Sequence, residues 1–405
     1  MEKLVYTPDK DVKVHEEGAI RLLCRHFQSH EAGLPEWLKN SADAYAREDA
    51  PETKRDIFVI FNNGRKGQPQ SISCLDFSGM TSSVIEDNFR IWADPEAALA
   101  KDRAITVQGG HGNGGKCYMT HMFLDHSFIY TVKEDRGCLY GVTGGSIKFG
   151  YVPDREQGRD FHVDNYIVEL DKALKGTGCP LYVLQKVASE AIRMSDGFTL
   201  LKGVGPKGYR NRIPTRHLID SLQDHPQMIQ TLEMCNVFIV IDGKLYNHGR
   251  KLCLPNIKPM EGEEKPLVIM IPETLLDPLS EEEVSTTEDG KQPQGALILK
   301  TSQASMRYKK KVRHNIIYKA RSGYIGYTPI PEFDVRSSYS AHIYGECECL
   351  ALENFKQNDR ADLANSPETR AVRQFISEQI QQYAEKFEAR DKRRYDKEEK
   401  NAISQ

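Results

Sequence analysis

The sequence lacks the features that mark secreted, zinc-binding and membrane-spanning proteins. Its nine cysteines are scattered along the chain, odd in number and without a CxxC pair. This pattern argues against a disulfide framework or a structural zinc site and favours a reducing compartment. The sequence has no long uninterrupted apolar run, and the N-terminal stretch MEKLVYTPDKDVKVHEE contains no apolar core of signal-peptide length. We therefore expect a cytoplasmic protein without a membrane span.

The sequence also lacks a strong net charge. Lys and Arg number 55 against 58 Asp and Glu, which gives a formal net charge of −3. Without a global basic field, a dedicated nucleic-acid binder is disfavoured, and any nucleic-acid contact would have to be local. With 405 residues, 39% of them hydrophobic, the chain exceeds what one core usually supports, so two or more domains are expected.

Hydrophobic periodicity and turn residues predict the α+β class. Residues 16–49 are mainly helical in pattern, with a helix start at Pro35. Strands are expected at RDIFVIFNN, SISCLDF, SFIYTVKED, CLYGVTGG, NYIVEL and PLYVL. Strands in such meanders, with helices on one side, favour an α+β layer over a doubly wound sheet.

A change of composition near residue 205 predicts a domain boundary. The stretch GVGPKGYRNRIP is rich in Gly, Pro and Arg, and further strand-like segments follow it. We expect a first domain over residues 1–205 and a smaller α+β domain over 206–360. A long helix is expected within 361–405, with Ser366 as its cap and Pro367 at its first position.

The segment EWLKNSADAYAR (36–47) carries an unusual set of polar residues. On a helix, Glu36, Asn40 and Asp43 share one face, because positions three and four apart are neighbours. A carboxylate and an amide would then be aimed at one point. The alternative is a solvated helix face, since charged residues are mostly exposed.

The segment VQGGHGNGGKCYM (107–119) allows two interpretations as a nucleotide site. Gly110, Gly115 and Lys116 match the GxxxxGK pattern of P-loop enzymes, with Asp242 after NVFIVI as the magnesium ligand. However, Cys117 stands where that pattern needs a hydroxyl, and Asp242-Gly243 is a ready hairpin turn. The P-loop interpretation is therefore the weaker one. In the other, the glycines form a flexible loop that opens a helix.

Four motifs follow one another along the chain: the ExxxNxxDA helix, the strand into LDFSGM, the glycine-rich loop and KGTG. This order resembles the GHKL ATPases, a family that includes gyrase-type topoisomerases, the ninety-kilodalton heat-shock chaperone, histidine kinases, MutL and MORC proteins. HGNGGK, and a polar NDRAD turn before a long helix, are similar to MORC-like and MutL-like proteins. The resemblance implies a Bergerat-type α/β sandwich that binds ATP and Mg²⁺, followed by a transducer-like domain.

On the phosphate side, the resemblance implies that Glu36 is the general base and Asn40 the magnesium ligand. Asp43 would support the water network there. A glutamate can activate water, an amide oxygen can hold magnesium, and glycines let backbone N–H groups close on phosphates. The implied phosphate lid comprises Gly110, Gly112, Asn113, Gly114, Gly115 and Lys116.

On the adenine side, the resemblance implies that Asp76 accepts the adenine amino proton. Gly79 and Met80 would shape the pocket, and Thr177 would join its hydrogen bonds. The family pattern DxGxGM is shortened here to Asp-Phe-Ser-Gly-Met, so Asp76 lies one residue nearer Gly79 than in the family. The alternatives are that Asp76 is a strand-end turn residue and Thr177 a plain loop hydroxyl.

The polar turn before the last helix offers Arg360, with Lys356 close by. In relatives that dimerise, a basic residue of the transducer reaches the γ-phosphate, and its charge would stabilise the transferring phosphoryl group. The resemblance thus implies an ATP-hydrolysing, ATP-gated homodimeric clamp or conformational switch. DNA transactions or bacterial defence, with an unidentified DNA or protein partner, are the implied setting. The alternative is a nucleotide-binding interaction module with negligible turnover.

Overall fold

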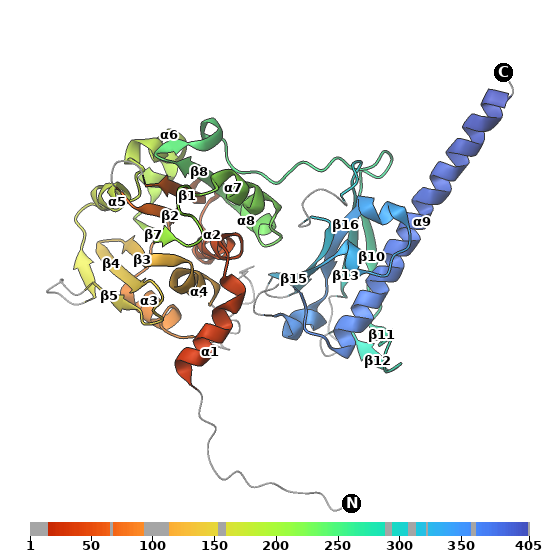
Figure 1. The fold of residues 1–405 in the computed structure, drawn as a ribbon, viewed down its shortest axis with the longest axis horizontal. Helices are drawn as coiled ribbons and strands as arrows, with labels where there is room; N and C mark the ends of the chain where they lie inside the picture. The colour runs from red at the N-terminus through yellow and green to blue at the C-terminus, as the bar shows by residue number, and fades with distance from the viewer. Residues whose placement is uncertain are drawn as a thin grey trace, which may run out of the picture.

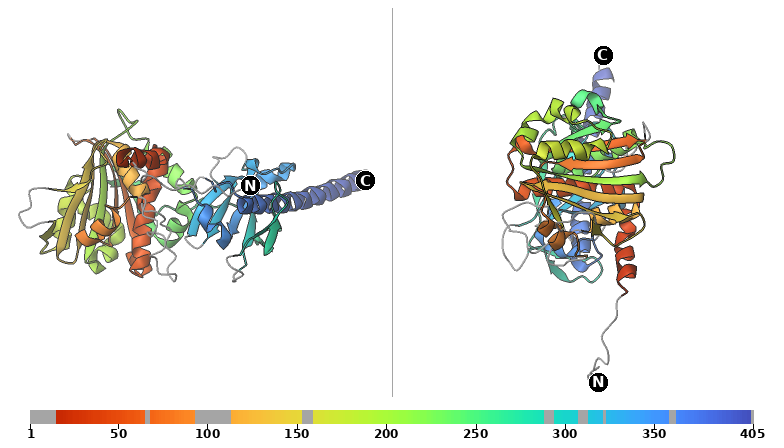
Figure 2. Two further views of the ribbon diagram at one scale, coloured as in Figure 1. Left: turned by 90° about the horizontal axis from the view of Figure 1, so that it is seen from below. Right: turned by 90° about the vertical axis from the view of Figure 1, so that its left-hand side faces the viewer.

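The computed structural model describes residues 15–64, 68–92, 113–152, 159–287, 294–306, 313–320, 323–357 and 362–403. These residues form a part with a nine-stranded sheet and a part with a five-stranded sheet. Helix α9 (Pro367–Ile403) extends away from the nine-stranded sheet, as the blue helix in Figure 1 and in the left view of Figure 2 shows. The α+β class with a long C-terminal helix is confirmed.

The nine-stranded sheet is mixed, because β1 pairs in parallel with β8 and antiparallel with β2. Its strand order is β5-β4-β3-β7-β2-β1-β8-β9, and β6 also pairs with β4. The strands are β1 (Asp56–Asn63), β2 (Gln70–Asp76), β3 (Phe123–Lys133), β4 (Arg136–Thr143), β5 (Gly150–Tyr151), β6 (Asp160–His162), β7 (Gly197–Pro206), β8 (Asn236–Ile241) and β9 (Lys244–Leu245).

Helices cover both faces of this sheet. Successive strand residues point to opposite faces, and β1 sends Val59 to one core and Phe58 to the other. The helices are α1 (Glu16–Leu23), α2 (His30–Arg47), α3 (Ser82–Asn88), α4 (Gly114–His121), α5 (Tyr166–Lys175), α6 (Leu181–Met194), α7 (Thr215–Asp224) and α8 (Met228–Met234). The Val59 core is shared with α2, α4, α7 and α8, and the Phe58 core with α5 and α6.

The prediction of helices on one side was therefore wrong, and so were the strands expected at NYIVEL and PLYVL. Both segments are helical, in α5 and α6. The Asn165 side chain caps α5 by accepting from the N–H groups of Ile167 and Val168. Short apolar runs do not distinguish a buried strand from a helix, and here the cap decides.

Helix α2 begins earlier than its sequence predicts. The Ser29 hydroxyl accepts from the N–H of Ala32 at 3.1 Å and caps the helix, which then runs through Pro35. Pro35 lacks only the one N–H that would have bonded four residues back. The predicted start at Pro35 was therefore wrong, because the Ser29 cap outweighs the missing bond.

The five-stranded sheet is also mixed and has the order β10-β13-β16-β14-β15. Its strands are β10 (Leu267–Met270), β13 (Ala296–Thr301), β14 (Asn315–Ala320), β15 (Gly323–Pro329) and β16 (Ile343–Glu348), and β11 (Thr274–Leu276) pairs with β12 (Glu283–Ser285) beside it. Helix α9 begins at Pro367, after the Ser366 cap that its sequence predicts. Its apolar residues, such as Ile376 and Ile380, are buried in the same core as Leu297 and Ile343 of the sheet.

The first sheet continues beyond residue 205, where the composition predicts a boundary. β8 pairs with β1 over six residue pairs, and α7 and α8 share the core of α2. Residues 251–266 then carry no helix or strand before β10 begins. We propose that the boundary between the two parts lies within 251–266. In the described ranges, no helix combines the length and apolar character needed to cross a bilayer.

Candidate functional site

The N-terminal end of α4 lies directly against the polar face of α2. A Cβ atom on Gly114 would lie 2.4 Å from Oε2 of Glu36, and one on Gly115 would lie 2.9 Å from Nδ2 of Asn40. The indole N–H of Trp37 donates to the Gly115 carbonyl at 3.3 Å. Only glycine permits this approach without displacing a neighbour. The structure thus brings Glu36, Asn40, Gly114 and Gly115 together.

Glu36 forms a buried ion pair with Lys39, which the sequence reasoning did not single out. The Lys39 ammonium donates to Oε2 of Glu36 at 2.7 Å, and the two side chains are 3% and 8% exposed. The charges of both residues affect the pKa of His225, at the end of α7, in opposite directions. Burial of His225 is the larger effect and lowers this pKa to about 4. His225 is therefore neutral at pH 7. The opposite charges at i and i+3 were the available sequence signal for the pair.

The other residues predicted on the phosphate side lie in several different places. Asp43 is buried on the same face of α2, and Asn113 is the residue before α4. Lys116 is buried, and its ammonium donates to the Ile91 carbonyl and lies 5.1 Å from the centre of the Trp92 ring. Gly110, Gly112 and Arg360 lie outside the described residues.

Asp76, the last residue of β2, is hydrogen-bonded to α2. The Ser41 hydroxyl donates to Oδ2 of Asp76 at 2.6 Å, and the Ser78 N–H donates to Oδ1 at 3.0 Å. Burial raises the pKa of Asp76 to about 6, although both hydrogen bonds oppose the rise. Ser41 follows Asn40 directly, so α2 connects Asp76 with the Glu36 end of the site. The sequence reasoning missed Ser41.

Gly79 and Met80 follow Asp76 in a turn that packs on β3. Gly79 has φ of +78°, and a Cβ there would lie 2.2 Å from the Val132 carbonyl oxygen, so the position requires glycine. The Met80 N–H donates to the Thr131 hydroxyl at 2.6 Å. The hydroxyl of Thr131 lies 3.2 Å from the hydroxyl of Thr199. Thr199 of β7 is the residue that pairs with Asp76 of β2. Besides Ser41, the hydroxyl residue next to Asp76 is therefore Thr199 of β7, and Thr131 connects Thr199 with Met80.

The structure places Thr177 apart from these residues, contrary to the sequence expectation. Its hydroxyl donates to the Leu174 carbonyl at 2.8 Å and accepts from the Cys179 N–H at 3.3 Å. The adjacent Gly178 lies against Asn62, which pairs with the start of β2, whereas Asp76 ends that strand. Thr177 thus caps the end of α5. The expectation took KGTG to precede a strand, whereas α6 follows it.

Asp242 has a structural role that removes one support for the P-loop interpretation. It lies between β8 and β9 with φ of +49°, as a hairpin turn requires. Its carboxylate accepts from the backbone N–H of Asn63 at 2.8 Å. The carboxylate therefore joins the ends of β1 and β8.

A magnesium site of the kind expected here does not need a carboxylate cluster. In the part of the chain that the structure describes, no three His, Cys, Asp or Glu side chains group closely enough to hold a metal. Mg²⁺ beside a nucleotide is usually bound by one or two protein oxygens together with phosphate oxygens and water. The carboxamide of Asn40, next to the glycines that begin α4, suits that role.

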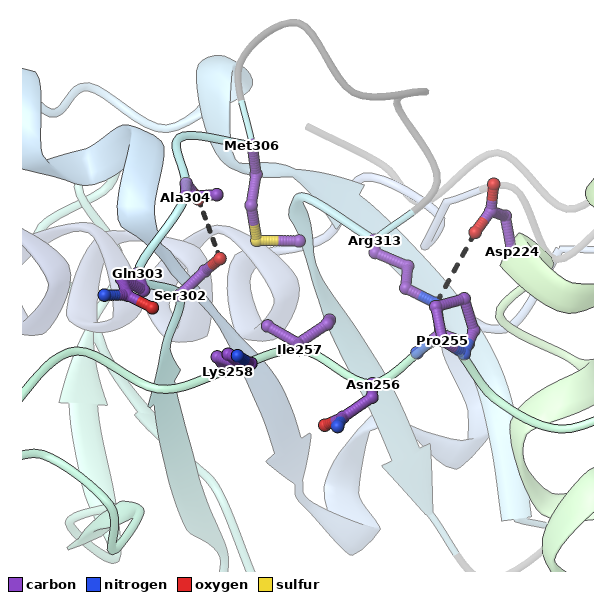
Figure 3. Close-up of a pocket in the computed structure, with 10 residues that line it drawn as sticks. All are labelled: Asp224, Pro255, Asn256, Ile257, Lys258, Ser302, Gln303, Ala304, Met306 and Arg313. Carbon is purple, nitrogen blue, oxygen red and sulfur yellow. Dashed lines mark hydrogen bonds and ion pairs between the residues drawn. The ribbon is translucent and has the colours of Figure 1, made fainter.

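A hollow of about 670 Å³ lies where α7 meets the second part of the chain (Figure 3). On its wall, Arg313 donates to the Gln223 carbonyl at 2.6 Å, and its Nε lies 3.8 Å from Asp224. These contacts connect Arg313, two residues before β14, with the end of α7, immediately before His225. The lining residues are Asp224, Pro255, Asn256, Ile257, Lys258, Ser302, Gln303, Ala304, Met306 and Arg313.

Comparisons with known proteins give little beyond a distant structural likeness. No family model matches the chain, and no curated protein sequence matches it. Among solved structures, 161 chains match. One is the crystal structure of the B-subunit of the DNA gyrase from Myxococcus xanthus, with a TM-score of 0.40 and 10% identity over 86% of this chain and 88% of that chain. This likeness is too low to transfer residue roles, which must be argued from geometry.

Proposed function

We propose that this chain binds and hydrolyses Mg-ATP as a GHKL-type ATPase and acts as an ATP-gated dimeric clamp or conformational switch. The observation that supports this most is the joining of two polar sites by one helix. Glu36 and Asn40 of α2 lie against the start of α4, and Ser41 of the same helix holds Asp76. This arrangement suits a nucleotide, with its phosphates at α4 and its adenine at Asp76.

The start of α4 is suited to phosphate binding. The first backbone N–H groups of a helix have no partner within the helix, and its dipole favours negative charge there. Gly114 and Gly115 carry no side chains of their own, so a phosphate could approach these N–H groups closely. The adjacent Asn40 would hold Mg²⁺, which when bound neutralises charge on the phosphate oxygens. The phosphates would then lie next to the Glu36 carboxylate.

Glu36 would be the general base for hydrolysis. Its carboxylate would accept a proton from the attacking water as that water bonds to the γ-phosphorus and the bond from the γ-phosphorus to the bridging oxygen breaks, releasing ADP. Burial between α2 and α4 limits competing solvent, and Lys39 supplies the opposite charge that a buried carboxylate needs. Asp76, when ionised, would accept a hydrogen bond from the adenine amino group.

The direct test is steady-state phosphate release from Mg-ATP by the full chain, with Glu36→Ala protein as the reference. We expect turnover that depends on Mg²⁺ and greatly exceeds that of the variant. A rate equal to that of the variant, with ATP still bound, would reject hydrolysis and favour a nucleotide-binding module with negligible turnover. A failure to bind ATP would reject both functions.

The raised pKa of Asp76 predicts that the affinity for nucleotide depends on pH. Its pKa of about 6 leaves it ionised at pH 7 and protonated in acid. Because the ionised carboxylate is the stronger acceptor for the adenine amino group, affinity should fall as pH drops below 6, by at most about tenfold per pH unit. Calorimetric titration of ADP between pH 5 and 8 measures the effect.

Asp76→Asn is the matched control, since its amide oxygen still accepts a hydrogen bond but does not titrate. The variant should keep only the slope that comes from the phosphates of ADP, which also titrate near pH 6. Equal slopes for the two proteins would show that Asp76 does not contact the adenine.

ATP, and not ADP, is expected to make the chain dimerise. A nucleotide shifts a conformational equilibrium only through its different affinity for the two states, and a tenfold shift needs about 1.4 kcal/mol. Contacts from the start of α4 to the γ-phosphate can supply this difference. We propose that the segment KLVYT, which has strand character, is exchanged between the two subunits; it belongs to residues 1–14, which lie outside the described residues.

Size-exclusion chromatography with light scattering checks this prediction. Glu36→Ala protein is the sample of choice, because it should hold ATP without consuming it. The mass is expected to rise from 46.0 kDa to about twice that value with ATP alone. The same mass with ATP, with ADP and without nucleotide would leave a monomeric switch in place of the clamp.

A further inference from the structure

Lys39 and Asn40 lie on opposite sides of Glu36 around the α2 axis. With 3.6 residues per turn, Lys39 is displaced by about 60° in one direction and Asn40 by about 40° in the other. Gly114 and Gly115 of α4 lie against Glu36 and Asn40. His225, at the end of α7, is near both members of the ion pair, because the charges of Glu36 and Lys39 both affect its pKa. Lys39 therefore supports Glu36 from the side away from Asn40.

The ion pair is not explained by stability alone. Burying two charges costs desolvation that their attraction often only repays, so a buried pair is weak evidence of a stabilising role. What the pair does provide is control of the carboxylate. The Lys39 ammonium favours the ionised form of Glu36 and holds Oε2 at 2.7 Å, which fixes the orientation of the whole group.

We infer that Lys39 is the positioning residue of the general base, holding Glu36 ionised and oriented for the attacking water without itself contacting the nucleotide. This inference rests on the proposed function, because it presumes that Glu36 activates water. A general base must lie within hydrogen-bond distance of its proton and in the correct protonation state. Lys39 secures both conditions through one contact.

The test measures kcat and KM for ATP in four full-length proteins: wild type, Lys39→Met, Lys39→Arg and Glu36→Gln. Lys39→Met should lower kcat by about tenfold or more while changing KM by less than about twofold, because it disturbs the base and not the binding. Lys39→Arg, which keeps the charge, should restore most of kcat.

The double variant Lys39→Met/Glu36→Gln separates action through Glu36 from independent action. Residues that act as a unit are not additive, so Lys39→Met should cause no further loss of single-turnover rate when Glu36 is already Gln. A several-fold rise in KM for Lys39→Met, or the same fold loss in both backgrounds, would instead show a phosphate contact or a separate role and overturn the inference.

Lys172 provides a matched control for the substitution. It pairs with Glu169 at 3.1 Å with the same i,i+3 spacing, but it is exposed. Lys172→Met should leave kcat unchanged, and thermal unfolding of each variant identifies loss of folded protein. Wild-type protein that neither binds nor hydrolyses ATP would overturn the proposed function together with this inference. Wild-type turnover that Lys39→Met leaves unchanged would overturn the inference alone.

Discussion

Replacing Glu36 with Ala is expected to lower ATP turnover by about 10²-fold or more while leaving ATP binding largely intact. The substitution removes the proton acceptor but neither Asn40 nor Asp76, which would bind the metal and the adenine. Phosphate release and equilibrium binding of ATP, measured on the same preparation, separate the two effects. An unchanged turnover number would reject Glu36 as the base.

Glu31 supplies a control on the same helix. Its carboxylate lies 3.0 Å from Nε2 of His217, and its side chain is 32% exposed. Glu31→Ala should leave turnover within about twofold of wild type, since exposed ion pairs contribute little. Glu36→Gln should accompany Glu36→Ala, because an alanine leaves the buried Lys39 charge without this partner and costs stability. Loss of turnover in the stably folded Gln variant would then come from the missing base.

The sequence predicted the α+β class well, because alternating apolar patterns and turn residues are local signals. It failed at NYIVEL and PLYVL, where a short apolar run fits either structure and the Asn165 cap decides. The parallel pairing of β8 with β1 joins residues about 180 positions apart, as in Asp56 with Asn236. Such pairing leaves no local mark, so a composition change near residue 205 was a poor guide to where the sheet ends.

In the candidate site too, local spacing could be predicted from the sequence and long-range contacts could not. Helical spacing alone placed Glu36, Asn40 and Asp43 on one face, and the glycines of α4 proved to lie against that face. Contacts made across the fold could not be read in this way. Ser41 reaches Asp76 only because α2 packs on the sheet, and Thr199 lies beside Asp76 only because β7 pairs with β2. Thr177 was chosen from a loop motif whose neighbours are set by the helices around it.

Gly114→Ala should impair both ATP binding and turnover, although its helix position would ordinarily favour alanine. Alanine is preferred over glycine within helices by about 1 kcal/mol. Here the added methyl group would lie 2.4 Å from Oε2 of Glu36, a carboxylate that the buried Lys39 also holds. Either α4 or Glu36 must move, and a displacement of about 1 Å at a reacting group can cost about 10²-fold in rate.

Gly150→Ala is the matched control, because a Cβ atom there meets nothing within 4 Å. We expect the control to keep wild-type activity, whereas Gly114→Ala should lose at least about tenfold in kcat/KM. Thermal unfolding adds a second readout, since the clash should offset the gain that helix propensity alone predicts. A Gly114→Ala protein that is more stable and fully active would show that α4 does not press on Glu36. The phosphate site would then have to be sought away from the start of that helix.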